Sequence, residues 1–136
     1  MRSLWIPILS FCLFLGIFLC LYLAWRPSPF LSELGWMPEG FARWTDAAAQ
    51  SNTRTGIPFV GLGLLGALVS WRLGSARVSW GMFLGLMGLS VLLELGQLGL
   101  PGRHPTVNDV VWGWLGLLVG WGSVLLVRGG FRRRRD

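Results

Sequence analysis

The chain has 136 residues, of which 53% are hydrophobic and 13% are charged, and its formal net charge is +6. This length allows a single domain, and long apolar runs separated by charged breaks exclude an ordinary soluble protein. The basic residues, all of them arginine, flank the apolar runs and form a tail, whereas a nucleic-acid-binding domain places them on a folded polar face. The composition therefore indicates an integral membrane protein, with the lipid bilayer and not nucleic acid as its partner.

The first apolar run, residues 4–25, carries no charge and is long enough to cross a hydrocarbon core of ~30 Å as a helix. A cleaved signal peptide is the alternative. Its apolar core would be shorter, however, and the Trp-Arg-Pro sequence at the end of this run offers no small-residue cleavage site. Cys12 and Cys20 lie in the run too far apart for a disulfide within one helix. We therefore expect a transmembrane helix here.

Residues 26–55 form the one long connection between apolar runs, and they contain three prolines. Within this connection, residues 39–50 are expected to form a short helix, and Trp36 and Trp44 suit the headgroup zone of a bilayer. Two roles stay open for the segment: packing at the membrane interface, or a lid that gates a ligand site.

Three further apolar runs follow, at residues 56–73, 78–100 and 107–127, and a basic tail occupies residues 128–136. The run at 56–73 is short for a span, so it needs to stand nearly upright or to be helped by Trp71 at its end. The sequence thus predicts an all-α fold, in which residues 1–136 form one membrane domain with four transmembrane helices. An even number of spans places both termini on the same side of the membrane.

The distribution of arginines predicts which side that is, because the cytoplasmic flanks of transmembrane helices carry the excess of positive charge. The side of the termini holds Arg2, Arg72, Arg77, Arg128 and Arg132 to Arg135. The other side holds Arg26, Arg43, Arg54 and Arg103. We therefore expect a multi-pass protein of the cell membrane with cytoplasmic N and C termini and with residues 94–109 toward the extracytoplasmic side. The terminal arginines either bind anionic lipid or only fix this orientation.

Polar residues gather where the third and fourth spans meet. Ionisable groups at membrane depth cost roughly 2.5 to 3.5 kcal/mol for Asp or Arg at a helix centre, so they are usually paired and often functional. We predict that a ligand-binding pocket is formed here by Glu94, Gln97, Arg103 and Asp109. Arg103 is the expected partner of one carboxylate, or of both through its forked donors.

The charge balance of this cluster leaves alternatives open, because two acids and one arginine leave one negative charge. Either a second cation such as Arg26 or Arg54 reaches the cluster, or Glu94 is partly protonated, or the site accepts a cationic group. A purely structural role is open as well. Thr106 with Asp109 three residues later fits a capping box, and the same network would clamp the two helices together.

Glycines recur at three- and four-residue spacing in the last two spans, which lets helix backbones approach closely in lipid. In the third span we predict a packing surface on the face of Gly81, Gly85, Gly88, Gly96 and Gly99. Another face of this span becomes polar only toward its end and holds Phe83, Met87, Ser90, Glu94 and Gln97. In the fourth span, Asp109 shares one face with Gly113, Gly116 and Gly120. We predict that these three glycines form a helix-packing face, and that they leave a groove without side chains below the carboxylate. These faces also offer surfaces to protein partners.

The sequence offers no catalytic constellation. His104 is the one histidine, and it has neither a nearby cysteine nor a metal-ligand spacing. No Ser, Cys or His is arranged as a nucleophile with a positioned base. We therefore predict no catalytic residue, no metal and no cofactor, which disfavours an enzyme without deciding the question.

The stretch from residue 94 to 116 resembles the VanZ-like family of small multi-span membrane proteins, named after an accessory protein for teicoplanin resistance. The family signature is an acid and a glutamine three apart at a helix end, a turn with Pro-Gly-Arg, and an Asp followed by Asn and Gly. The matching residues are Glu94, Gln97, Pro101, Gly102, Arg103, Asp109 and Gly116, and Gly113 stands where the family has Asn. The resemblance covers roughly the last third of the chain. It implies a cell-envelope protein, in a family that lacks an agreed biochemical activity and that includes members reducing susceptibility to an antibiotic acting on the outer membrane face.

Three functional hypotheses follow. The leading one is a VanZ-like membrane protein that acts through the polar cluster at the outer leaflet on a cell-envelope or lipid-linked component, such as an anionic lipid or a cell-wall precursor. The alternative is a noncatalytic structural or assembly subunit of a larger membrane complex, because the glycine faces and nine tryptophans offer more packing surface than four short helices need. A third is a small proton-coupled exporter with Glu94 as proton carrier, although Glu94 lies near one end of its span and no internal repeat is evident.

Overall fold

The computed structural model describes residues 4–28, 30–47, 51–101 and 103–133, and of residues 51, 52 and 131–133 it describes the backbone. Several residues to which the sequence analysis assigned a role lie outside these ranges: Arg2, Gly102, Arg134 and Arg135.

All regular structure in the described residues is helical, which confirms the predicted class. In chain order the elements are α1 (Trp5–Ala24), the 3₁₀ helix η1 (Leu31–Glu33), α2 (Glu39–Asp46), α3 (Ser51–Leu73), α4 (Ala76–Gln97) and α5 (Val107–Arg133). The helices α1, α3, α4 and α5 are each long and apolar enough to cross a membrane. The prediction of four such helices is therefore confirmed.

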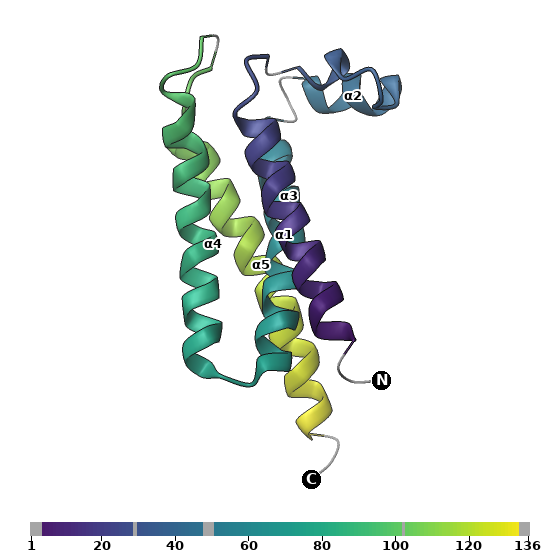
Figure 1. Cartoon of the computed structure of the whole chain (residues 1–136), viewed down its shortest axis with the longest axis vertical. Helices are drawn as coiled ribbons and strands as arrows, with labels where there is room; N and C mark the ends of the chain where they lie inside the picture. The colour runs from purple at the N-terminus through teal and green to yellow at the C-terminus, as the bar shows by residue number, and fades with distance from the viewer. Residues whose placement is uncertain (1–3, 29, 48–50, 102, 134–136) are drawn as a thin grey trace.

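The four long helices lie alongside one another and give the molecule two distinct ends (Figure 1). One end, here called the terminal end, holds the start of α1, the end of α5 and the turn between α3 and α4. The opposite end, here called the loop end, holds the α1–α2 and α4–α5 connections, and α2 extends sideways from it. The first and last helices thus begin and end at the same end, as an even number of crossings requires.

Helix α3 begins at Ser51, ahead of the apolar run that starts at residue 56. Hydropathy marks only the later part of this helix, because the first turn of α3 is polar. That polar turn is held by partners at the loop end: Arg54 pairs with Asp46 at 3.8 Å, and the Thr55 hydroxyl donates to Asp109 at 3.2 Å. The extra turn gives α3 a full span length, so it needs no special upright placement.

Glycines let the backbones of α3 and α5 meet, and this seam is the centre of the bundle. A Cβ added at Gly116 would collide with the carbonyl oxygen of Gly56, and one added at Gly120 would collide with that of Val60. Leu117 lies between these two glycines on α5 and is fully buried. The space below Asp109 is therefore filled by α3, and the groove without side chains expected there is closed.

The helix α4 turns its partly polar face toward the bundle. Phe83 packs edge-on against Trp121 of α5 with ring centroids 5.2 Å apart, and Ser90 is 2% exposed. On the other side of α4, no atom lies within 4 Å of a Cβ added to Gly81, Gly85 or Gly88. Within the described chain the predicted packing surface is used at Gly96, against Trp25, and not at Gly81, Gly85, Gly88 or Gly99, because α4 meets the α3–α5 seam through its larger side chains.

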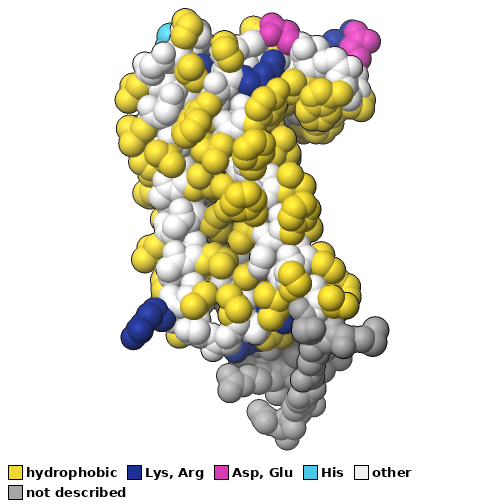
Figure 2. Space-filling view, in the orientation of Figure 1, with side chains coloured by type: hydrophobic (Ala, Val, Ile, Leu, Met, Phe, Trp, Pro, Cys, Tyr) yellow, Lys and Arg dark blue, Asp and Glu magenta, His cyan; other side chains and the backbone are white. Residues whose placement is uncertain are grey.

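The first helix packs loosely on the others, and Leu13 is its one buried residue. Its end is held more firmly. The indole of Trp25 lies against Gly96 of α4 and donates to the carbonyl oxygen of Leu93 at 3.3 Å. Hydrophobic side chains cover the length of the bundle, and the charged side chains lie toward its two ends (Figure 2).

The segments η1 and α2 form an arm at the loop end that is tied together by one carboxylate. Asp46 accepts hydrogen bonds from the backbone N–H groups of Leu31 at 2.7 Å and Ser32 at 2.8 Å, and its side chain is 10% exposed. Burial alone would raise the pKa of Asp46, but these hydrogen bonds and the charge of Arg54 together lower it. The arm is amphipathic, since Ala42 is buried and two large aromatic residues of α2 are exposed, Phe41 and Trp44.

Candidate functional site

The four residues of the predicted cluster come together at the loop end. Glu94 and Gln97 lie in the last turn of α4, Arg103 lies in the connection to α5, and Asp109 lies in the first turn of α5. All four side chains are half-buried. Residues from both flanking helices and their connection therefore meet, and their hydrogen bonds show what each one does.

Glu94 caps the helix that follows its own. Its Oε2 accepts a hydrogen bond from the backbone N–H of Thr106 at 3.1 Å, and its Oε1 accepts one from Gln97 Nε2 at 3.3 Å. Thr106 directly precedes α5, so its N–H is one of the groups that the helix leaves without an intrahelical partner. The carboxylate of α4 thus joins the start of α5 to the end of α4.

Thr106 and Asp109 form the predicted cap at the start of α5, with one difference. The Thr106 hydroxyl accepts from the Asp109 N–H at 3.1 Å and donates to Asp109 Oδ2 at 2.8 Å. In a capping box the acid three residues into the helix reaches back to the N–H of the capping residue. Here Glu94 occupies that N–H, and Asp109 Oδ1 accepts from Thr55 on α3 at 3.2 Å. The cap therefore ties three helices together.

Arg103 binds the end of α1 and neither carboxylate. Its guanidinium donates to three backbone carbonyl oxygens, those of Leu23 at 3.0 Å, Arg26 at 3.2 Å and Ser28 at 3.2 Å. Leu23 lies in the last turn of α1, where carbonyls lack intrahelical donors, and Arg26 and Ser28 lie in the segment that follows. The half-buried guanidinium thus ties the end of α1 to the start of the next connection. Arg103 acts at this position as a C-terminal clamp for α1.

The prediction of an ion pair between Arg103 and Glu94 or Asp109 is therefore wrong. Among the described residues, the pairs within 4.0 Å are Arg43 with Glu39 and Arg54 with Asp46. The physical reason is competition: three fixed carbonyl oxygens at the end of α1 occupy a donor group that the sequence pattern assigned to the nearest carboxylates.

The charges near Arg103 are mainly positive. Burial is the largest effect that lowers the pKa of Arg103, the charges of Arg54 and Arg26 lower it further, and Glu94 opposes them with the smallest effect. Arg26 Nη1 donates to the Phe30 carbonyl oxygen at 3.4 Å. One expected way to balance the charge of the cluster was a second cation, Arg26 or Arg54. Both lie near enough to Arg103 to lower its pKa. We call Arg26, Arg54 and Arg103 the arginine group.

A mostly apolar groove on α1 leads to this arginine group. It has a volume of about 420 Å³ and is lined by Phe18, Leu21, Tyr22, Trp25, Arg26 and Pro27. The sequence analysis missed it, although Phe18, Tyr22 and Trp25 follow the helical spacing of four and three residues directly before a cation. That spacing in an apolar helix is usually a lipid-facing surface, so only the tertiary arrangement shows that the groove adjoins the polar cluster.

Comparison of the chain with models of protein families, with curated proteins and with solved structures finds no match. The resemblance to the VanZ-like family therefore stays a prediction. The structure adds one fact about its main departure. Gly113 lies against Ser90 and Phe59, with their nearest side-chain atoms 3.2 Å and 3.4 Å from an added Cβ, so an asparagine here would require its neighbours to move.

The connection from α4 to α5 has one further polar residue, His104, for which the structure shows no contact with this network. His104 is exposed, and the described residues contain no group of three His, Cys, Asp or Glu side chains placed to hold a metal ion. The arrangement at the loop end can therefore do two things chemically: hold four helices in register, and present the guanidinium of Arg26 at an apolar groove.

Proposed function

We propose that this chain is a multi-pass membrane protein that binds an anionic, lipid-linked component of the cell envelope at its loop end. The four long helices span the bilayer, and the loop end lies at the outer leaflet. The anionic group meets the arginine group, and the apolar chain lies in the groove on α1. Glu94 and Asp109 hold the helices around this site and meet any cationic group that the ligand carries.

The observation that carries this proposal is the position of Arg26, which lines the apolar groove and whose backbone oxygen is bound by Arg103. Like charges in a half-buried place repel one another, and those of Arg54 and Arg26 add to burial in lowering the pKa of Arg103. A bound anion would relieve that repulsion, and forked guanidinium donors match phosphate and carboxylate oxygens. Arg26 also lines the groove, so one residue joins the charged part of the site to its apolar part.

The arm supports the assignment of the loop end to a membrane surface. Its helix α2 buries Ala42 and exposes Phe41, at 53%, and Trp44, at 46%. Aromatic residues on an amphipathic helix are typical of the headgroup zone. Because the arginine count favours cytoplasmic termini, this surface is proposed to be the extracytoplasmic one.

The test is binding of a fluorescent long-chain alkyl phosphate to the purified full chain in phosphatidylcholine nanodiscs. Arg26→Gln is the decisive variant, because the clamp of α1 uses only the backbone oxygen of Arg26. We expect about tenfold weaker binding, as for the loss of one charge-assisted hydrogen bond.

Arg72→Gln is the matched control, since it removes the same charge from the opposite end of the bundle. It should bind the alkyl phosphate as the wild type does. Equal affinities of the wild type and Arg26→Gln, with unchanged helicity, would overturn the proposal.

A second candidate function, a noncatalytic subunit of a larger membrane complex, is favoured by the free glycine face of α4. Gly81, Gly85 and Gly88 meet nothing within the described chain, whereas the glycines of the α3–α5 seam are fully used. Gly85→Leu should then reduce cross-linked or co-purified assemblies in native membranes without changing the stability of the isolated chain. Purification from mild detergent as a lone monomer, by both wild type and variant, would speak against this candidate.

A further inference from the structure

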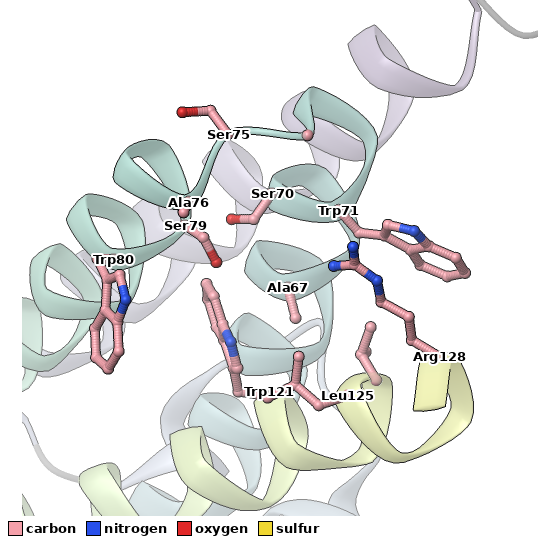
Figure 3. Close-up of a pocket in the computed structure, with 12 residues that line it drawn as sticks. Ala67, Ser70, Trp71, Ser75, Ala76, Ser79, Trp80, Trp121, Leu125 and Arg128 are labelled. Carbon is pink, nitrogen blue, oxygen red and sulfur yellow. The ribbon is translucent and has the colours of Figure 1, made fainter. Parts of the chain in front are cut away.

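A second hollow lies at the terminal end of the bundle, beside the turn between α3 and α4 (Figure 3). It has a volume of about 240 Å³ and lies between the last turns of α3, the first turn of α4 and the last turns of α5. Its lining combines hydroxyl, indole and guanidinium groups, notably those of Ser70, Ser79, Trp71, Trp121 and Arg128. None of these residues takes part in the loop-end site.

Two hydroxyl groups point into this hollow from facing helices (Figure 3). Ser70 on α3 is 4% exposed, and its hydroxyl donates to the sulfur of Met82 at 3.5 Å. A thioether is a weak acceptor, so a stronger acceptor inside the hollow would take over this donor. Ser79 on α4 faces it from the other side. Ser75 is different: its side chain points away from the hollow and accepts from Val78 N–H at 3.4 Å as the cap of α4.

The charges around the hollow are positive. The guanidinium of Arg128 reaches over it from α5 beside the indole of Trp71 (Figure 3). The start of α4, whose N-terminal dipole end is positive, forms another wall. Every acidic residue of the described chain belongs to the arm or to the cluster at the loop end, namely Glu33, Glu39, Asp46, Glu94 and Asp109. No described carboxylate is therefore at hand to neutralise Arg128.

We propose that this hollow binds the phosphate group of an acidic phospholipid in the leaflet at the terminal end. Arg128 and the hydroxyls of Ser70 and Ser79 contact the phosphate oxygens. The indoles of Trp71 and Trp80 lie at the headgroup level, where tryptophan is typically found. The acyl chains continue along the exposed apolar surface beside the hollow, which includes Leu125 at 53% exposure. This site is separate from the function proposed for the loop end and needs only that the helices span a bilayer.

Retention of lipid by the purified full chain tests the proposal. Fluorescent phosphatidylglycerol is titrated into detergent-solubilised protein. Fluorescent phosphatidylcholine and inorganic phosphate are titrated in separate experiments. Arg128→Gln should weaken the binding of phosphatidylglycerol about tenfold, as expected for a lost charge-assisted hydrogen bond, and Ser79→Ala should weaken it less. Arg77→Gln is the matched control, because it removes the same charge from the same end but does not line the hollow.

These titrations distinguish two sources of a bound phosphate group, a lipid headgroup and free inorganic phosphate. Binding of phosphatidylglycerol that depends on Arg128 and is not matched by inorganic phosphate supports the lipid. Equally tight binding of inorganic phosphate with the same dependence on Arg128 supports the phosphate site but assigns it to the free ion. Equal losses in Arg128→Gln and Arg77→Gln, or equal binding of phosphatidylcholine, would overturn the proposal, since the attraction would then be a general effect of charge or of lipid. Circular dichroism of Arg128→Gln and Ser79→Ala checks that both variants remain folded.

Discussion

At the scale of single residues, Glu94 on α4 makes a capping hydrogen bond that an acid on α5 itself would usually make. It accepts from Thr106 N–H, the bond that a capping box gives to the acid three residues into α5. Asp109 occupies that position but has one methylene fewer than glutamate, and it bonds the Thr106 hydroxyl and Thr55 instead. The exchange converts a local cap into a contact between helices.

A double-mutant cycle on Glu94 and Arg103 tests this division of roles. Glu94→Ala should lower the free energy of unfolding by about 1–2 kcal/mol, the cost of a lost cap, and Glu94→Gln by less because an amide oxygen remains to accept from Thr106. Arg103→Gln should cost about 2 kcal/mol or more, because it leaves three carbonyl oxygens of the α1 end without their donor. Denaturant unfolding in detergent measures each variant.

The two residues bind different helices, so their effects should add to within about 0.5 kcal/mol. A coupling energy above about 1 kcal/mol would instead indicate the direct ion pair that the sequence pattern favoured.

Asp46 gives the arm a dependence on pH. Its pKa in the folded chain lies below the ordinary value of 3.8, so the ionised form is the one that the fold stabilises. The contribution of Asp46 to the arm is therefore complete above pH 3.8 and is lost as the pH falls through the lower folded value. The amide-proton shifts of Leu31 and Ser32, measured by NMR in detergent micelles, should titrate only below pH 3.8. Asp46→Asn should abolish this titration, and a transition above that pH would contradict the argument.

At the scale of helices, glycine serves opposite purposes in α4 and α5. On α5, Gly116 and Gly120 bring the backbone against α3. On α4 the same spacing at Gly81, Gly85 and Gly88 meets no part of the described chain. Spacing alone therefore does not say whether a glycine face is used inside the molecule, because both faces have the same local pattern.

Gly116→Ala is expected to destabilise the fold by about 1–3 kcal/mol, because the new methyl group collides with the Gly56 carbonyl oxygen across the seam. Gly122→Ala on the same helix is the matched control. Nothing lies within 4 Å of a Cβ added there, so the higher helix propensity of alanine should leave stability unchanged or raise it by up to about 1 kcal/mol. Denaturant unfolding in detergent compares the two variants, and similar stabilities would show that α3 and α5 do not approach so closely in the folded protein.

At the scale of the whole molecule, the two ends differ in charge. The loop end gathers the described acids and four arginines, whereas the described charges at the terminal end are all arginines: Arg72, Arg77 and Arg128. This asymmetry underlies both the predicted orientation and the two proposed anion sites, which lie at opposite ends of the bundle.

The orientation is testable with single cysteines in a chain whose Cys12 and Cys20 have been replaced by alanine. Gly35→Cys, at the loop end, should react in intact cells with a thiol reagent that does not cross membranes. Gly74→Cys is unsuitable because this residue has a positive φ of 72°, so Arg77→Cys serves at the terminal end and should react only after the membrane is opened. The reverse pattern would place the termini outside and move the loop-end site to the cytoplasm.

The sequence by itself determined the class of this protein: an all-helical chain with four apolar helices, and a concentration of polar residues where the last two of them meet. Those properties are local, because span length, hydropathy and a capping pattern are each contained within about twenty residues. The tertiary structure alone decided the partners. Arg103 reaches carbonyl oxygens that lie 75 to 80 residues earlier in the chain, and Glu94 takes a bond that belongs to the next helix. It also decided which glycine face is packed and that the groove on α1 ends at Arg26, next to the segment that Arg103 binds. Such contacts depend on how the helices are placed side by side. Which acceptors a guanidinium binds depends on geometry and burial, and the spacing of residues along the chain determines neither.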